Sequence, residues 1–166
     1  MSKEFIIAVD LGGTNLKLAV LGLNYNIIKK DILDTRSFKK KESLILAIES
    51  GIKNIVKSTT LKQGRILGIG LGLPGPVDSI KGKVHFLPNI PGWKEVNLKS
   101  ILQKSLKFPV FLDNDAKLMA LAEYRLGDAA KFKNVLCITL GTGVGGGIIL
   151  GGELYRGADN SAGEIG

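Results

Sequence analysis

The same local plan occurs twice in this sequence of 166 residues: an apolar strand, a turn rich in glycine and threonine, and a second apolar strand. The first copy spans residues 5–21 with its turn at Leu11–Asn15, and the second spans residues 135–150 with its turn at Gly141–Gly147. Because a recurring supersecondary unit indicates a repeated fold, the pattern predicts two similar domains, 1–116 and 117–166. The second copy lies close to the last residue, so we expect the second domain to be truncated.

The segments between the two copies determine the expected fold class. Residues 27–33 form a third strand after a short turn, so the chain begins with an antiparallel meander. The order β-β-β-α-β-α-β-α then predicts an α/β domain with a mixed five-stranded sheet and helices on its faces. The later strands are expected at 66–71 and 109–113, a short extended piece at 84–91, and helices at 42–57, after Asn97 and at 115–126.

The first glycine turn can be interpreted in two ways. In Asp10-Leu-Gly-Gly-Thr14, Gly12 and Gly13 let backbone amides point at an anion with no Cβ in the way, and Thr14 adds a donor. Asp10 could hold Mg²⁺ directly or through water. Gly-Gly is also an ordinary hairpin connector, and the five residues alone favour neither interpretation.

The second glycine turn contains G-x-G-x-x-G, formed by Gly141, Gly143 and Gly146. This motif binds dinucleotides only when it opens a helix, whereas a short apolar strand follows here. No Gly-Lys-Ser/Thr follows any glycine run, which excludes a Walker-type loop. The remaining interpretation is a strand–turn–strand phosphate cradle, and two of these, one per domain, suit a nucleotide bound between domains.

A third polar segment, Asp113-Asn-Asp115, lies where an apolar strand runs directly into a helix. A carboxylate at this junction is well placed for catalysis, because it lies at a sheet edge and a helix N-terminus. The same position is the usual one for a helix N-cap. The two roles are compatible, since Asp113 or Asn114 can cap the helix and leave Asp115 for chemistry.

Composition excludes several other classes. The net charge is +8, but the lysines are scattered, with one run at Lys39–Lys41, so we expect a solvated surface and no nucleic-acid partner. No apolar run approaches the ~20 residues of a membrane span, and no signal-peptide layout is present. The single cysteine, Cys137, lies in an apolar run, as is typical of a reducing compartment. The expected location is the cytoplasm.

Five segments together resemble the ROK family, bacterial-type sugar kinases of the actin-like ATPase (ribonuclease H-like) superfamily, and its glucokinases most closely. The resemblance covers the whole chain and depends on the order and rough spacing of the segments. They are Asp10–Thr14, Gly72–Pro76, Asp113–Ala116, Leu140–Gly147 and Ala162–Gly166.

The resemblance implies ATP-dependent phosphorylation of a hexose, glucose to glucose 6-phosphate, with Asp115 as general base on the sugar hydroxyl. It implies sugar contacts from Gly75, Asn89, Asn114 and Glu164. The first phosphate motif would comprise Asp10, Gly12, Gly13, Thr14 and Asn15, and the second Leu140–Gly147, with Gly141, Thr142 and Gly143 on ATP. Mg²⁺ would accompany ATP, residues 1–116 would form the sugar-binding domain, and residues 117–166 would begin the nucleotide-side domain.

The sequence departs from the family by stopping early. Family members continue after Gly-Glu-Ile-Gly into a histidine, a cysteine-rich zinc motif and most of the nucleotide-side domain. No zinc ligands are therefore expected in this chain, and the lone His85 is interpreted as surface or core. We expect the fragment to be inactive and its full-length parent, a homodimer or tetramer by the resemblance, to be active.

Three alternatives stay open. The parent could phosphorylate another hexose, such as fructose, N-acetylmannosamine, N-acetylglucosamine or allose. It could be a sugar-responsive ROK repressor, although only nine residues precede Asp10 in this sequence, which leaves no room for a winged-helix segment. It could also be a non-catalytic sugar-binding module.

Overall fold

The computed structural model describes residues 3–57, 64–87, 90–141 and 143–166. The chain divides into two compact units, Met1–Leu112 and Asp113–Gly166. The division falls within a strand, whereas the sequence predicted it after Ala116, within the following helix.

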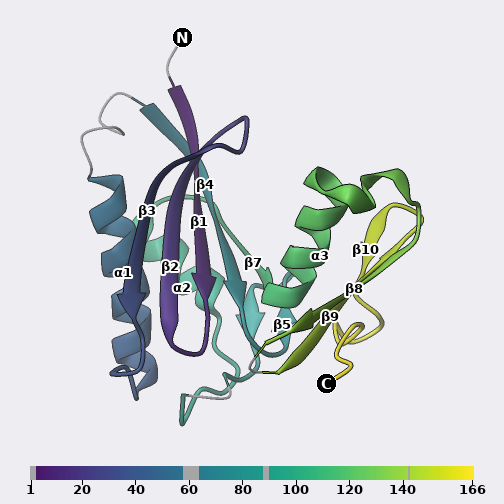
Figure 1. Cartoon of the computed structure of the whole chain (residues 1–166). Helices are drawn as coiled ribbons and strands as arrows, with labels where there is room; N and C mark the ends of the chain where they lie inside the picture. The colour runs from purple at the N-terminus through teal and green to yellow at the C-terminus, as the bar shows by residue number, and fades with distance from the viewer. Residues whose placement is uncertain (1–2, 58–63, 88–89, 142) are drawn as a thin grey trace. The chain divides into compact units, whose positions relative to one another are not determined.

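The first unit is built on a five-stranded sheet with the order β3-β2-β1-β4-β7 (Figure 1). Strand β1 pairs antiparallel with β2 and parallel with β4, which confirms the predicted mixed sheet. The strands are β1 Lys3–Leu11, β2 Asn15–Gly22, β3 Ile27–Asp34, β4 Gly64–Leu73 and β7 Val110–Asn114.

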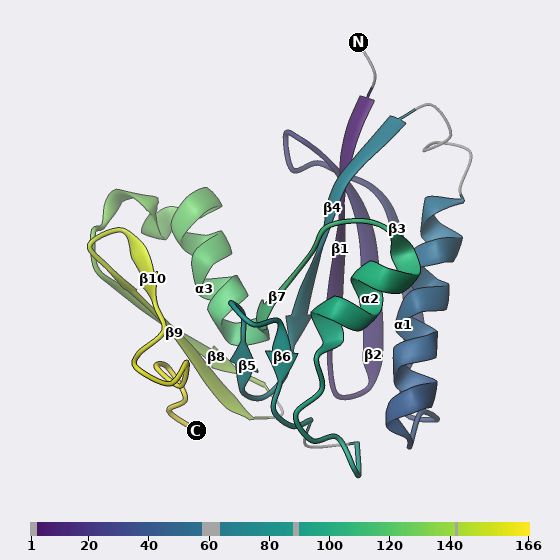
Figure 2. The same ribbon diagram turned by 180° about the vertical axis from the view of Figure 1, so that it is seen from behind.

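Two helices, α1 Lys41–Val56 and α2 Leu98–Leu106, pack beside each other against the apolar core of this unit (Figure 2). The helix predicted at 42–57 is confirmed, and its apolar face is buried at Leu44, Ile48, Ile52 and Ile55, which are at most 1% exposed. The helix predicted after Asn97 is α2, and Asn97 caps it, since its Oδ1 accepts a hydrogen bond from the backbone N–H of Ser100 at 3.3 Å.

A small hairpin that the sequence did not predict follows β4. It comprises β5 Val77–Asp78 and β6 Lys83–Val84, whereas the sequence predicted only a short extended piece further on, at 84–91. The turn is held by Asp78, whose Oδ1 accepts from the backbone N–H of Lys81 at 2.9 Å. This hydrogen bond lowers the pKa of Asp78, although partial burial opposes the shift.

The second unit consists of α3 Asp115–Leu126, a 3₁₀ turn Asp128–Lys131 and an antiparallel sheet of order β10-β9-β8 (Figure 1). The strands are β8 Val135–Leu140, β9 Val144–Leu150 and β10 Glu153–Tyr155. The predicted turn Gly141–Gly147 was too long, because β9 already begins at Val144 and pairs with Leu140.

The β8 side chains alternate in exposure. Val135, Cys137 and Thr139 are half-buried, whereas Leu136, Ile138 and Leu140 are 58%, 54% and 83% exposed. Burial raises the pKa of the Cys137 thiol, as expected for a cysteine that packs as a small apolar residue. Among the described residues, no helix has the length and hydropathy to cross a membrane.

Candidate active site

The polar segment between β7 and α3 contains a helix cap. The side-chain oxygen of Asn114 accepts a hydrogen bond from the backbone N–H of Lys117 at 3.0 Å. This bond satisfies one of the first-turn amides that a helix leaves without an intrahelical partner. Asn114 is only 4% exposed, so the cap is part of the packed interior of the second unit.

The preceding residue, Asp113, has a structural partner as well. Its Oδ2 accepts from Nη2 of Arg156 at 2.6 Å and from Nε of Arg156 at 3.2 Å. Asp113 is 4% exposed, and a buried carboxylate needs a charged or hydrogen-bonding partner of this kind. Arg156 was not predicted as a site residue, since it lies 43 residues away in the sequence.

Asp115 is the first residue of α3 and is half-buried. Its Oδ1 accepts from the backbone N–H of Ala116 at 2.8 Å. The helix N-terminus stabilises a negative charge at this position. Within this segment, Asn114 caps the helix, Asp113 pairs with Arg156, and Asp115 occupies the first helical position.

Lys117, in the first turn of α3, contacts Glu164 and so places it near the start of this helix. Lys117 was not among the residues that the sequence predicted. The Lys117 side chain is 1% exposed, and its Nζ lies 3.4 Å from Oε1 of Glu164. Nζ also donates to the backbone carbonyl of Asn160. The available signal was a single basic residue among the apolar positions at the start of α3. The structure thus brings Asn114, Asp115 and Glu164 together within the second unit.

The second glycine segment separates into two parts with different surroundings. A Cβ at Gly141 or Gly143 would meet nothing within 4 Å, and neither residue has a positive φ. In contrast, a Cβ at Gly145 would lie 2.9 Å from Cβ of Ala116, and one at Gly147 would overlap Cβ of Ala120. Gly145 and Gly147 of β9 therefore serve close packing on α3, whereas Gly141 and Gly143 of the turn face open space. The predicted Thr142 lies outside the described residues.

The first glycine turn is a tight connection between β1 and β2. Gly12 donates its N–H to the carbonyl of Asn15 at 2.8 Å, and Asn15 Nδ2 donates to Oγ1 of Thr14 at 3.2 Å. A Cβ at Gly12 would make only an ordinary contact, 3.4 Å from Asn15 O, and its φ is not positive. Glycine is thus not required there by the internal geometry of the turn.

Asp10 forms a cross-strand ion pair with Lys17, Oδ2 to Nζ, at 3.1 Å. The two residues are direct partners in the β1–β2 register. Lys17 was not predicted, although a hairpin centred on the glycine turn places it opposite Asp10. Both side chains are at least half exposed, so the pair contributes little to stability and mainly orients the carboxylate.

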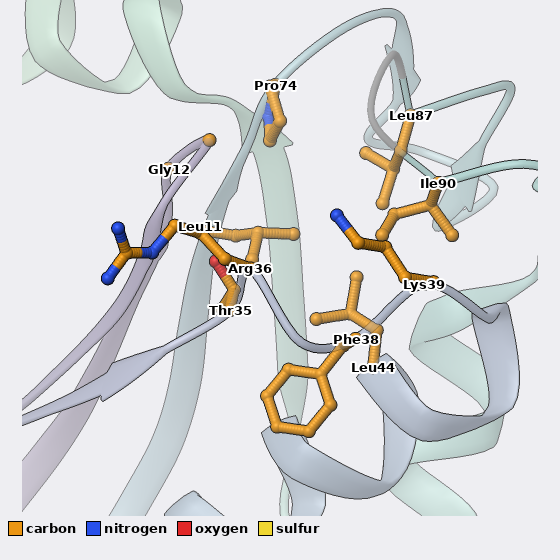
Figure 3. A pocket seen from close by; sticks show the side chains of 11 residues that line it. Leu11, Gly12, Thr35, Arg36, Phe38, Lys39, Leu44, Pro74, Leu87 and Ile90 are labelled. Carbon is orange, nitrogen blue, oxygen red and sulfur yellow. The ribbon is translucent and has the colours of Figure 1, made fainter.

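A pocket of about 290 Å³ opens in the first unit beside this turn (Figure 3). Figure 3 shows Lys39 extending its ammonium group between Leu11 and Ile90, whereas the guanidinium of Arg36 points away. Lys39 belongs to the run that the sequence suggested was solvated surface. The lining residues are Leu11, Gly12, Gly13, Thr35, Arg36, Phe38, Lys39, Leu44, Pro74, Leu87 and Ile90.

Of the other predicted sugar contacts, Gly75 follows the pocket residue Pro74 and has φ of +80°. That backbone conformation favours glycine, which accounts for the residue at this turn. Asn89 lies outside the described residues. The predicted residues of the first unit therefore gather around the glycine turn and the pocket, and those of the second around the start of α3.

The magnesium expectation rests on Asp10. Among residues 3–57, 64–87, 90–141 and 143–166, no three His, Cys, Asp or Glu side chains group closely enough to hold a metal ion. Mg²⁺ bound with a nucleotide needs only one or two protein carboxylates, because phosphates and water supply the other ligands. The ion pair of Asp10 with Lys17 uses Oδ2 alone. The carboxylate of Asp10 therefore fits the role of the one protein ligand to a Mg²⁺ that is bound with the nucleotide.

Comparison with known proteins identifies one family. The ROK family model matches residues 6–166. A glucokinase of Halalkalibacterium halodurans is 37% identical over 166 residues, which are 100% of this chain and 50% of that protein. A xylose repressor of Caldicellulosiruptor bescii is 34% identical over 161 residues, 97% of this chain and 40% of the repressor.

Solved structures agree with the predicted fold. A ROK family glucokinase from Streptomyces griseus, in complex with glucose and AMPPNP, superimposes with a TM-score of 0.85 at 34% identity. The match covers 98% of this chain and 49% of that one. The chain spans about half the length of the relatives it matches.

Proposed function

Because the chain belongs to the ROK family, we propose that it supplies the sugar side and the first phosphate cradle of an ATP-dependent hexose kinase that converts glucose to glucose 6-phosphate. The observation that carries this proposal is the division of labour at the start of α3. Asn114 caps the helix and Asp113 binds Arg156, and Asp115 is a half-buried carboxylate at the first position of α3, which suits a general base.

In the proposed reaction, Asp115 accepts the proton of the sugar hydroxyl while the hydroxyl oxygen attacks the γ-phosphorus of ATP. A bond forms between the sugar oxygen and phosphorus, the bond to the β-phosphate oxygen breaks, and ADP leaves. Phosphoryl transfer depends mostly on positioning and charge stabilisation. A carboxylate at a helix N-terminus is a weak base, but a loose transition state allows the proton to leave late.

Each of the two glycine turns would serve as a phosphate motif of its own unit. Gly12, Gly141 and Gly143 are not required to be glycine by backbone conformation or packing, which supports the interpretation that a ligand approaches these positions. Thr14 would add a hydroxyl donor, with Thr142 as its counterpart in the second turn. Asp10, oriented by Lys17, would hold the Mg²⁺ that neutralises charge on the transferred phosphoryl group.

Sugar selection would come from polar side chains that each require a hydroxyl partner. A site built in this way rejects an epimer that leaves one of its polar groups unpaired. Glu164 and Asn114 would provide such groups in the second unit, and Gly75 and Asn89 in the first.

A coupled ADP-release assay on the full-length protein, across a panel of hexoses, tests the proposal. We expect glucose-dependent ADP release with the highest kcat/KM for glucose. A higher kcat/KM for fructose, N-acetylmannosamine, N-acetylglucosamine or allose would support the kinase activity but assign it a different preferred hexose. No ADP release with any hexose would refute the kinase.

The similarity to a xylose repressor favours a second candidate, a sugar-responsive regulator. The two are separated by adding a gel-shift assay to the same panel. Sugar-dependent DNA binding without ADP release would support the regulator, and sugar binding with neither activity would support a non-catalytic module.

A further inference from the structure

We propose that Lys117 is a positioning residue that holds the carboxylate of Glu164 in place for the hexose. This inference rests on the proposed function, because it concerns the sugar contact assigned to Glu164. Lys117 does not itself reach the sugar, since its side chain is 1% exposed. It would act only through the groups that its ammonium contacts inside the second unit.

The burial of Lys117 is the first argument. A buried ammonium group loses its hydration, and only good pairing offsets this loss, so burial of lysine in a small unit requires specific partners. Lys117 Nζ has two, the carbonyl of Asn160 and Oε1 of Glu164, both in the C-terminal segment. Its charge therefore fixes that segment to the first turn of α3.

The geometry at Glu164 is the second argument. Its side chain is 41% exposed, so the carboxylate is held at one end and open to solvent at the other. The contact uses Oε1, at 3.4 Å from Nζ, which leaves Oε2 for a ligand hydroxyl. Without this contact, a half-exposed glutamate on a loop would sample many rotamers, and ligand binding would carry the entropy cost of ordering it.

A second ion pair fixes the same segment without contacting Glu164. Arg156 binds Asp113 at 2.6 Å, so the residues that flank Asn114 and Asp115 both hold the C-terminal segment. The two ion pairs have opposite polarity. Asp113 supplies the acid to the basic Arg156 of the C-terminal segment, and Lys117 supplies the base to the acidic Glu164. Arg156 thus stabilises the segment as a whole, whereas Lys117 also orients Glu164.

The test compares Lys117→Met, Glu164→Gln and the double variant in the full-length protein. Methionine matches the length of lysine and suits a buried position, and the Glu164 left behind can hydrate, so the variant should fold. We expect Lys117→Met to raise the hexose KM about tenfold, the effect of weakening one hydrogen bond to a charged group. The kcat should stay within about twofold and the KM for ATP should not change.

The double variant separates orientation from general destabilisation. If Lys117 acts through Glu164, Lys117→Met adds nothing to the KM of Glu164→Gln. Effects on KM that multiply, or an unchanged KM in Lys117→Met, would overturn the proposal. Lys133→Met, the same change at an exposed lysine, is the matched control and should leave KM unchanged.

Two further arms keep the outcome interpretable. If methionine prevents folding, Lys117→Gln keeps a donor without the charge, and an unchanged hexose KM in that variant would also overturn the proposal. If the wild-type protein releases no ADP with any hexose, the proposed function fails. Calorimetric hexose binding by the same variants then tests Lys117 and Glu164 independently, and equal affinities would refute the positioning role.

Discussion

The two parts of the second glycine segment should respond oppositely to the same substitution. In Gly147→Ala, the new Cβ would overlap Cβ of Ala120 and lie 3.2 Å from the carbonyl of Ala116 and 3.3 Å from Cα of Lys117. Two of these neighbours belong to the backbone of α3 and cannot rotate away. Overpacking of this kind costs about 2 kcal/mol, or about 4–8 °C in Tm for a chain of this size.

The matched change is Gly141→Ala, for which Cβ would enter open space at a φ that alanine tolerates. Its stability should be unchanged or raised by up to about 1 kcal/mol through the unfolded state. In the full-length protein it should instead raise the KM for ATP, because the methyl group would stand where the phosphates approach.

Thermal and urea unfolding of the 166-residue chain measure the first effect, and ATP kinetics of the full-length protein measure the second. A Gly147→Ala variant as stable as wild type would refute the packing argument. An unchanged KM for ATP in Gly141→Ala would refute the phosphate interpretation of the turn.

Three further predictions concern the first unit. Lys17→Met should raise the KM for Mg-ATP while changing the unfolding free energy by less than about 1 kcal/mol, since the pair with Asp10 is exposed; a large loss of stability would contradict this. The hydrogen bond with His85 lowers the pKa of Glu95 from 4.5, so this contribution is complete above that pH and is lost as pH falls through the lowered value. Urea titrations should therefore show wild type losing its advantage over Glu95→Gln below pH 4.5, and a constant difference would refute the linkage. Asn97→Ala should cost about 1 kcal/mol by removing the α2 cap, measured by urea unfolding, and no loss would show that the cap is dispensable.

Local patterns in the sequence were sufficient for most elements of the fold. Periodicity predicted α1, and the change from an apolar strand to a helix-forming run placed α3 at Asp115–Leu126. The β5–β6 hairpin was not predicted because its two strands have two residues each, which is too short to show an alternation of polar and apolar residues. The start of β9 was misplaced because glycines at Gly145–Gly147 suggested a turn, whereas Gly145 and Gly147 permit close packing against α3 and Gly146 packs against the C-terminal segment at Gly163.

The candidate site shows a sharper limit. The segment Asp113–Asp115 was recognisable as polar residues at a strand–helix junction, but Asp113 and Asn114 were both candidates for the cap. The cap is decided by a local hydrogen bond, from the N–H of Lys117 to Asn114, whereas the partner of Asp113, Arg156, lies 43 residues away and could not be predicted. Lys117 and Glu164 could not be paired from the sequence for the same reason, since their contact depends on how the C-terminal segment folds back onto α3.

Asp115→Asn in the full-length protein tests the central claim most directly. The substitution keeps the shape of the side chain and removes its ability to accept a proton. We expect kcat to fall by at least about 100-fold, the contribution of a general base, with hexose affinity by calorimetry nearly unchanged. Asp128→Asn, the same change at an exposed carboxylate, should leave both unaffected. A near-normal kcat in Asp115→Asn would contradict the assignment of Asp115 as the general base.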